Sequence, residues 1–491
     1  MKLLDLIVFF GYLIGITLFG SSFFKKNRSA ASFTLGSKNI PSWVISMSIF
    51  ATFVSSISFL ALPGNAYLSN WNAFVFSLSI PLAMVIAVKY FVPLYRKINS
   101  PSAYTFLEER FGPWARVYVS ACYILTQVMR VGTILYLLAL AFHAIVGWDI
   151  VTIIIITGVT VMIYSLLGGF EAVVWTDAIQ GIILIGGALV SALYILFSMP
   201  EGPGQLFRIA AENHKFSLGS FGPSLSEPTF WVVLIYGFFI NLQNYGIDQN
   251  YVQRYMASKT DREAKRSAFW GGIIYVPVSL VFIFIGTALF SFYHSGAATL
   301  PAALQQADMS DRIFPYFMVT QLPEGITGLL IASVFAAGMS TISTSFNSSA
   351  TVFLTDYYNR YSKKELSNRK SMRVLYLSSF IISVVGILVA ICMINVKSAL
   401  DAWWKLASIF SGGMLGLFLL AAFSRITRSA GALAGVIAGL LVILWLSISP
   451  LIAGGRLAGS HFHSFLTIVF ATITIFFVGF FASLLLKRKA A

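Results

Sequence analysis

Apolar stretches of about 20 residues recur along the whole chain and are separated by short polar or charged segments. A run of that length crosses the hydrocarbon core of a bilayer as an α-helix, because each helical residue adds about 1.5 Å. The pattern therefore predicts an all-α integral membrane protein with a single transmembrane domain over residues 1–491. Thirteen spans are expected, at residues 4–22, 41–67, 72–95, 117–146, 149–168, 176–199, 229–253, 267–295, 323–355, 374–395, 400–424, 430–450 and 464–486.

One segment within these spans, residues 329–350, is unusually rich in hydroxyl groups. Its apolar first half is followed by five hydroxyl side chains within six residues. In a helix, Ser340, Ser343 and Thr344 share one face, with Thr341 beside them. So many hydroxyls need polar partners inside a bilayer. They either bond to neighbouring helices in a tightly packed bundle or coordinate a cation.

Two other spans are interrupted by polar residues. In the second span, hydroxyls gather over residues 46–59, so this stretch is either unwound, with free backbone carbonyls, or part of a packing helix kinked near Pro63. The seventh span is interrupted over residues 241–249 by asparagine, glutamine, glycine and aspartate. The two interrupted spans lie five spans apart, which fits two inverted repeats of five helices around a transport site at the middle of the membrane.

Two charged side chains fall where an apolar helix is expected. Arg130 lies well inside the fourth span, where it either pairs with a protein carboxylate or carbonyl or receives an anionic substrate. Its guanidinium suits a carboxylate because it can donate two parallel hydrogen bonds. Asp177 follows a tight connection at Gly168 and Gly169 and is expected at the start of the sixth span. There it either compensates the helix dipole as a surface group or lies beside the hydroxyl cluster.

Composition supports a membrane protein and argues against several other classes. The chain is 58% hydrophobic and only 10% charged, with a mean hydropathy of +0.83. Its two cysteines lie in apolar segments and its five histidines are scattered, so neither a disulfide framework nor a zinc or di-iron site is expected. No phosphate-binding Walker pattern, nucleophile elbow or HExxH motif is present. ATP-driven transport and enzymatic activity are therefore not expected.

The net charge of +15 is distributed as in a membrane protein rather than as a nucleic-acid surface. Basic residues concentrate in alternate connections, which the positive-inside rule assigns to the cytoplasm. The N-terminus is therefore expected outside a cell membrane, the C-terminus inside, and residues 4–22 as a retained helix rather than a cleaved signal. The cytoplasmic side would hold 24 of the 33 basic residues: Lys25, Lys26, Arg28, Lys38, Arg96, Lys97, Arg110, Arg116, Arg254, Lys259, Arg262, Lys265, Arg266, Arg360, Lys363, Lys364, Arg369, Lys370, Arg373, Arg425, Arg428, Lys487, Arg488 and Lys489. The outer side would hold six: Lys2, Arg208, Lys215, Arg312, Lys397 and Arg456.

Two motifs resemble a known family. GGFEAVVWTDAIQG, residues 168–181, is similar to the signature of the sodium:solute symporter family, and FAAGMSTISTSFNSS, residues 335–349, is similar to its eighth core helix. With the thirteen spans, the resemblance covers nearly the whole chain. It implies a LeuT-type fold with a leading helix at 4–22, a first five-helix repeat at 41–199, a second at 229–424 and two trailing helices at 430–486.

The resemblance also implies sodium as the coupling ion and no organic cofactor. The usual sodium site of the family takes backbone carbonyls from the first core helix, and a carbonyl plus hydroxyls from the eighth. The matching residues are Ala51, Val54, Ala337, Ser340 and Thr341. Uncharged oxygens suit a monovalent cation, since Mg²⁺ and Ca²⁺ normally demand carboxylates. Some members, including bacterial sialic acid symporters, bind a second sodium, for which the matching residues are Asp177, Ser340, Ser343 and Thr344.

The substrate positions resemble those of the sialic acid symporters more than those of the sodium/galactose member. Arg130 matches the arginine with which sialic acid symporters clasp the substrate carboxylate. Three galactose-contacting positions do not match and are here Ser58, Ser77 and Tyr275. Three positions also depart from the sialic acid pattern: Phe53 replaces a threonine, Ser77 a glutamine and Ala73 a phenylalanine. The candidate substrate-binding residues are Ser55, Ser56, Ser58, Ser77, Arg130, Asn241, Asn244 and Tyr245.

The expected function is therefore sodium-coupled symport of an anionic sugar, with N-acetylneuraminate as the leading candidate, by alternating access. The partners would be this small solute, one or two sodium ions and membrane lipids, with no nucleic acid, and the protein would act as a monomer. A sodium symporter for a neutral sugar, an amino acid or a monocarboxylate is the alternative. In that case Arg130 would be structural, beside Asp248. A channel or sensor is a further alternative.

Overall fold

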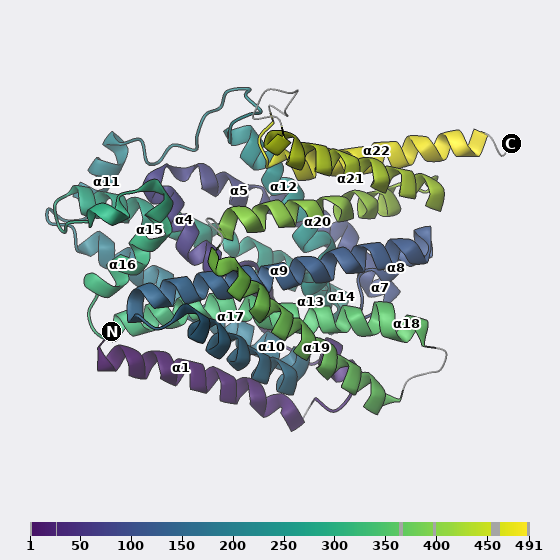
Figure 1. Cartoon of the computed structure of the whole chain (residues 1–491), viewed down its shortest axis with the longest axis horizontal. Helices are drawn as coiled ribbons and strands as arrows, with labels where there is room; N and C mark the ends of the chain where they lie inside the picture. Colours follow the sequence, from purple (N-terminus) through teal and green to yellow (C-terminus); the bar gives the residue numbers. More distant parts are fainter. Residues whose placement is uncertain (1, 26, 363–366, 396–398, 453–461, 489–491) are drawn as a thin grey trace.

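The computed structural model describes every residue except 1, 26, 363–366, 396–398, 453–461 and 489–491. The described part is helical throughout, with no strand in it, and most long helices run along the horizontal axis of Figure 1. The first half holds α1 (Leu3–Ser21), α2 (Ala30–Leu35), α3 (Ser42–Phe53), α4 (Ser56–Leu68), α5 (Phe74–Leu78), α6 (Ile80–Ile86), α7 (Val92–Ile98), α8 (Thr105–Phe111), α9 (Pro113–Val146), α10 (Ile150–Phe197) and α11 (Pro203–Glu212). The second half holds α12 (Phe230–Ile247), α13 (Gln249–Ala257), α14 (Asp261–Ile273), α15 (Tyr275–His294), α16 (Ile313–Thr320), α17 (Ile326–Val352), α18 (Asn359–Tyr361), α19 (Asn368–Cys392), α20 (Ala399–Phe423), α21 (Ser429–Ile452) and α22 (Leu466–Arg488).

The described helices support a multi-pass membrane protein. Ten of them, or eleven when α3 and α4 are joined as one bent span, are long and apolar enough to cross a bilayer. The predicted count of thirteen is not confirmed by this criterion and stays a prediction. The difference between eleven and thirteen spans has two sources. The single helix α10 covers two predicted spans, and the apolar part of α20, Ser411–Phe423, is too short to be included in the count.

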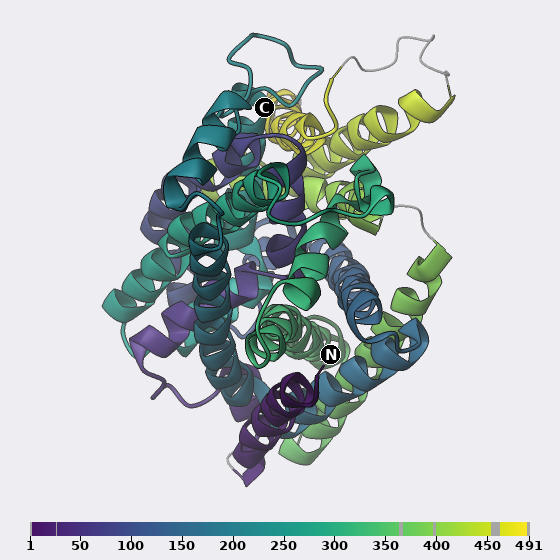
Figure 2. The ribbon, with the colours of Figure 1, turned by 90° about the vertical axis from the view of Figure 1, so that its left-hand side faces the viewer.

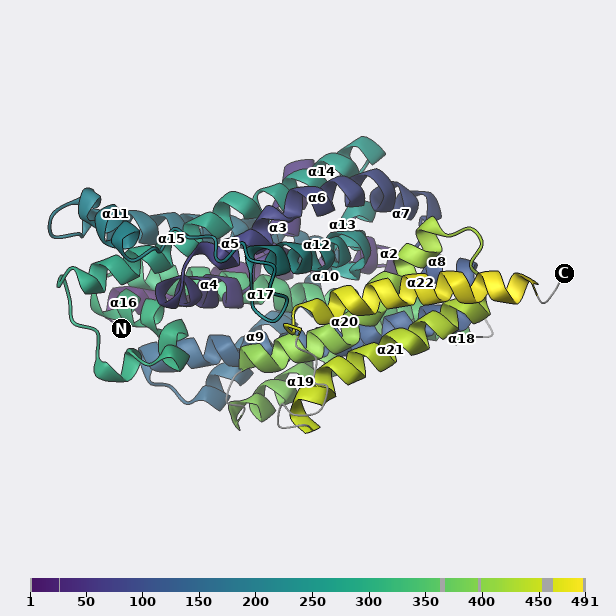
Figure 3. The same cartoon turned by 90° about the horizontal axis from the view of Figure 1, so that it is seen from above.

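α17 lies at the centre of the bundle. In the most apolar 18-residue stretch of this span, 89% of the residues are buried, whereas in the corresponding stretch of the span that contains α1 only 28% are buried. It packs against α1, α3, α4, α9, α10 and α19, and in Figure 2 its ribbon is seen nearly end-on among the others. Its hydroxyls from Ser340 to Ser345 are all buried, so they face other helices rather than lipid. The trailing helices α20, α21 and α22 instead gather on one side of the bundle (Figure 3).

The second predicted span is a broken helix. α3 and α4 are bent by 56° at the break, where Val54 and Ser55 have extended backbone conformations. The unwound stretch is therefore confirmed. Pro63 lies inside α4 and does not cause the break, so the alternative of a helix kinked near this proline is wrong.

The seventh predicted span is also broken, as predicted. α12 ends and α13 begins at Asp248, whose ψ of 127° is extended. The Asp248 carboxylate caps α13 by accepting a hydrogen bond from the backbone N–H of Asn250 at 2.8 Å. Two helix breaks thus place free backbone groups in the interior of the bundle.

α10 turns sharply at Gly169, where φ is +60° and ψ is −158°, so the predicted tight connection is confirmed. Glycine is required there because a Cβ would also lie 2.8 Å from the Asn27 side-chain amide. The predicted position of Asp177 at the start of a span is wrong. The helix resumes at Phe170, and Asp177 lies two turns further on and is fully buried, which excludes a surface dipole role.

The two chain termini lie at opposite ends of the bundle (Figure 1). At the end where α1 begins lie two short helices, α11 in the connection before α12 and α16 in the connection before α17; most residues of α16 are buried. Six of the basic residues used to assign the orientation lie outside the described residues: Lys26, Lys363, Lys364, Lys397, Arg456 and Lys489. Two others, Arg116 and Arg254, are buried in ion pairs and so are not surface charges, contrary to expectation.

Candidate functional site

The first break lies against the hydroxyl cluster of α17. The Thr341 hydroxyl is 3.3 Å from the Val54 carbonyl oxygen and 3.2 Å from the Ala337 carbonyl oxygen. The Ser340 hydroxyl is buried and has no hydrogen-bond partner among the described residues. Ala51 is also buried, one turn before Val54 on α3. Three of the residues predicted to bind the first sodium, Val54, Ala337 and Thr341, therefore meet, and the unsatisfied hydroxyl of neighbouring Ser340 suits a cation.

Asp177 lies beside the same cluster, as one of the two sequence interpretations predicted. One carboxylate oxygen accepts hydrogen bonds from the Ser48 hydroxyl at 2.8 Å and the Thr344 hydroxyl at 3.3 Å. The same oxygen is 2.6 Å from Nη2 of Arg254, and both side chains of this ion pair are completely buried. The other carboxylate oxygen has no partner within the described chain. Asp177 thus has one oxygen neutralised by arginine and one available to a further cation.

Arg130 points toward the first break. One guanidinium nitrogen donates a hydrogen bond to the Thr52 carbonyl oxygen at 3.3 Å. Among the described residues, however, Arg130 forms no ion pair. A partly buried arginine with most of its donors unused is suited to bind an anion.

The other predicted substrate residues fall into two groups. Ser55, Ser56 and Ser58 begin α4 at the first break, and Tyr245 reaches the same place by stacking on Phe53, with ring centroids 5.2 Å apart. The second group lies where α12 meets α5 and α6. There the Asn241 amide donates hydrogen bonds to the Phe76 carbonyl at 3.3 Å and the Ser79 hydroxyl at 3.0 Å, and Ser77 is buried nearby. Asn244 is half-buried on α12, between these two groups in sequence.

Sequence reasoning missed several polar residues that connect the cluster to α13. Arg254 was counted as a cytoplasmic surface charge, yet it donates hydrogen bonds to Ser48 at 2.7 Å and Thr344 at 2.8 Å in addition to its ion pair. Asn250 accepts hydrogen bonds from Tyr123 at 2.8 Å and Ser348 at 2.5 Å. One signal was available: Asn250 and Arg254 are spaced i, i+4 in the helix that directly follows a broken span.

Comparison with known proteins identifies the family. The family model described as "Sodium:solute symporter family" matches residues 33–439. The chain belongs to this family. It is therefore a membrane transporter that couples solute movement to sodium, which confirms both the family and the coupling ion expected from the motifs.

Two bacterial relatives and one solved structure are similar over most of the chain. The sodium/sialic acid symporter of Proteus mirabilis (strain HI4320) is 34% identical over 441 residues, which cover 89% of this chain and 88% of that protein. The corresponding symporter of Aliivibrio fischeri (strain ATCC 700601 / ES114) is 32% identical, covering 90% and 87%. The substrate-bound outward-open structure of a Na⁺-coupled sialic acid symporter matches with a TM-score of 0.91 at 30% identity, covering 99% of this chain and 98% of that one. The present chain therefore has the same fold as that symporter, which is of the LeuT-like type.

Proposed function

We propose that this protein is a sodium-coupled symporter that imports N-acetylneuraminate by alternating access. The relatives named for sialic acid support this substrate because they cover nearly the whole chain. The observation that carries the proposal is Arg130, a guanidinium at the first helix break without an ion-pair partner among the described residues. It would receive the sugar carboxylate through two parallel hydrogen bonds. Ser55, Ser58 and Tyr245 would contact the rest of the sugar from the same break, whereas Ser56 lines a separate small cavity.

The first sodium would bind the carbonyls of Ala51, Val54 and Ala337 and the hydroxyls of Ser340 and Thr341. Bound there, it would join the first break to α17 and so stabilise the outward-facing state, in which the sugar then binds. Loss of sodium to the cytoplasm would permit release of the sugar inward. Sodium couples to transport only because its affinity differs between the two states.

A second sodium would bind the free oxygen of Asp177 together with Ser340, Ser343 and Thr344. The unsatisfied oxygens of Asp177 and Ser340 support this assignment. Arg254 would remain on the opposite oxygen of the carboxylate, so the site would hold one negative charge between two cations. Its sodium affinity is therefore expected to be lower than that of a free carboxylate.

The finer topology is also part of the proposal. Counting α10 as two spans that meet at Gly169, joining α3 with α4, and including α20 gives thirteen crossings. An odd number of crossings fits termini at opposite ends of the bundle (Figure 1). The charge distribution would then place the N-terminus outside and the C-terminus in the cytoplasm. The protein would act as a monomer.

The test is uptake of labelled N-acetylneuraminate into proteoliposomes, with and without an inward sodium gradient. Wild type should accumulate the sugar only with the gradient. Arg130→Ala should lose at least about tenfold in apparent affinity, since the charged hydrogen bonds to the carboxylate disappear. Arg208→Ala is the matched control, because this arginine pairs with Glu201 on the surface and should not affect uptake.

The same experiment distinguishes a second candidate, a sodium symporter for another solute. The hydrogen bond from Arg130 to the Thr52 carbonyl oxygen favours it, since this arginine would then hold the end of α3 in place rather than bind the solute. In that case Arg130→Ala would lower thermal stability while sodium-dependent transport of the other solute kept its affinity. Absence of sialic acid uptake by a folded wild-type protein that sodium stabilises would refute the proposed substrate. It would leave the family assignment unchanged.

A further inference from the structure

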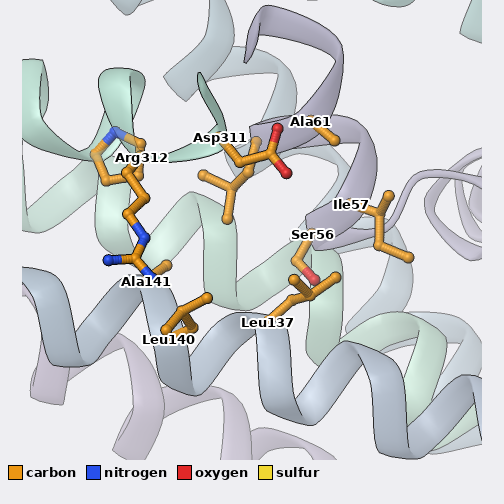
Figure 4. Close-up of a pocket in the computed structure, with 10 residues that line it drawn as sticks. Ser56, Ile57, Ala61, Leu137, Leu140, Ala141, Asp311 and Arg312 are labelled. Carbon is orange, nitrogen blue, oxygen red and sulfur yellow. The ribbon is translucent and has the colours of Figure 1, made fainter. Parts of the chain in front are cut away.

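A small cavity lies on the outer side of the first break (Figure 4). It is enclosed by the start of α4, by α9 and by the segment that leads into α16, and Ser56 lines it. Of the residues on α9 that line the cavity, Leu137 is the nearest to Arg130 in sequence. It lies two turns after Arg130, which is about 10 Å along the helix axis. The cavity therefore lies between the proposed substrate site and the end of the bundle that holds the N-terminus.

The cavity is apolar except at a few positions, and one of these is a carboxylate. Asp311 lines it from the segment before α16 and forms no ion pair with any described residue. Its neighbour Arg312 is exposed, and Figure 4 shows the guanidinium extended toward Ala141 on α9, away from the Asp311 carboxylate. Burial raises the pKa of Asp311 above its ordinary value, and no neighbouring cation opposes this effect. Arg312 also lines the cavity, but the Asp311 carboxylate has no ion-pair partner among the described residues.

Other oxygens face the same region. Gly64 on α4 permits a close approach: a Cβ built there would be 2.7 Å from Oδ1 of Asp311 and 3.0 Å from the Ser310 carbonyl oxygen. Both oxygens therefore pack against α4 at Gly64. At the inner side of the cavity, the Ser56 hydroxyl is fully buried and has no partner among the described residues. An unpaired carboxylate and an unsatisfied hydroxyl line one small space.

The size and charge of the cavity select its ligand. The space open to water-sized spheres is about 40 Å³, enough for a few waters and too small for a sugar acid. The carboxylate excludes an anion. A divalent ion would require additional carboxylates, which do not line the cavity among the described residues. A partly hydrated monovalent cation fits both the volume and the oxygens.

We propose that Asp311 and Ser56 form an outer sodium-capture site, which sodium occupies before it reaches the inner site. This inference rests on the proposed function, since it assigns an entry route to the coupling ion. Ser56 lines the cavity and lies two residues after Val54, the carbonyl of which contacts Thr341 at the inner site. The route from Asp311 to the inner ligands is therefore short. A fixed negative charge along such a route raises the local sodium concentration.

The test measures sodium binding without solute, as sodium-induced thermal stabilisation of the purified full-length protein, with choline chloride keeping ionic strength constant. Asp311→Asn should raise the half-saturating sodium concentration about threefold to tenfold, because the variant removes the carboxylate that attracts the cation. Asp311→Glu should restore most of the affinity. Asp149→Asn is the matched control: this exposed carboxylate caps α10 in the outer connection after α9, and asparagine preserves the cap.

Ala61→Lys provides an independent variant, because Ala61 lines the cavity and an ammonium there would neutralise Asp311 without removing it. It should weaken sodium binding as Asp311→Asn does. Half-saturating concentrations within about twofold of wild type for both variants would overturn the capture site, since loss or neutralisation of a carboxylate that attracts sodium should weaken binding by more than that. An equal effect of Asp149→Asn would overturn it too, because the effect would then reflect general surface charge. A wild-type protein that sodium does not stabilise would instead contradict the proposed sodium sites.

Discussion

The buried ion pair between Arg254 and Asp177 permits a sharp test of the polar core. Arg254→Leu removes a side chain that makes a 2.6 Å ion pair with Asp177 and hydrogen bonds to Ser48 at 2.7 Å, Thr344 at 2.8 Å and the Asn250 carbonyl at 2.5 Å. All of these groups are buried, so no water replaces the lost donors. Breaking a buried pair by removing one partner costs about 3–5 kcal/mol, chiefly because a charge remains uncompensated. We expect a loss of that size in the free energy of unfolding.

The assay is denaturant unfolding in detergent over a series of sodium concentrations. Sodium should rescue Arg254→Leu more than it stabilises wild type, because the cation would compensate the free Asp177 carboxylate. At a sodium concentration about 100 times the dissociation constant, the rescue would reach about 2.7 kcal/mol. The double variant Arg254→Leu/Asp177→Leu should recover much of the stability without sodium, since it leaves no unpaired charge.

Arg116→Leu is the matched control for this experiment. Arg116 makes a similar buried pair with Asp356 at 2.6 Å and also binds Glu108 at 2.8 Å. Its loss should destabilise the protein to a similar degree, but without a sodium-dependent rescue, since no sodium ligand is proposed there. A loss below about 1 kcal/mol for Arg254→Leu would refute the interpretation of the pair. So would an equal sodium rescue of both variants.

Two further predictions concern the scaffold. Asp5→Ala should destabilise the protein by about 1–2 kcal/mol, because one Asp5 oxygen accepts hydrogen bonds from two backbone amides at the start of α17, at 2.8 Å and 3.0 Å; the thermal midpoint in detergent checks this. Gly169→Ala should lower the same midpoint by the equivalent of about 1–3 kcal/mol, because alanine would be strained at a φ of +60°, whereas Gly186→Ala, with open space around it, should not. A midpoint for Gly169→Ala as high as that for Gly186→Ala would contradict the strain argument.

The sequence was informative wherever polar residues interrupt an apolar pattern. The breaks at Val54–Ser55 and at Asp248 followed from runs of hydroxyl and amide side chains that a bilayer does not tolerate in a regular lipid-facing helix. The turn at Gly169 followed from paired glycines between two apolar runs. These features are local, so a pattern along the chain is enough to predict them.

The polar partners of these residues were harder to predict, because they depend on contacts between distant helices. The predicted span begins at residue 176, six residues after Phe170, where the helix resumes, because nothing in the sequence marks Phe170 as that point. The basic connection after Arg254 predicts a surface charge, and only the folded structure, which brings Arg254 to Asp177 on α10 and Thr344 on α17, reveals its partners. The lone carboxylate of Asp311 had no signal, because its surroundings come from α4 and α9.

The contacts of α13 bear directly on how the bundle could change state. All nine of its residues are buried, yet its polar side chains bond mainly to neighbouring elements: Gln249 to the Pro101 carbonyl at 2.6 Å, and Gln253 to the Thr34 carbonyl at 2.8 Å and Thr351 at 3.0 Å. Water can replace each such hydrogen bond, so its loss costs only about 0.5–1.5 kcal/mol when the surfaces separate into water. Separation of an apolar interface of the same area would expose apolar surface to water, and no new hydrogen bonds would offset that cost. The half-helix after the second break can therefore part from the segment around Pro101 at modest cost, whereas parting it from α10 and α17 would also break the buried ion pair between Arg254 and Asp177, at the cost of about 3–5 kcal/mol.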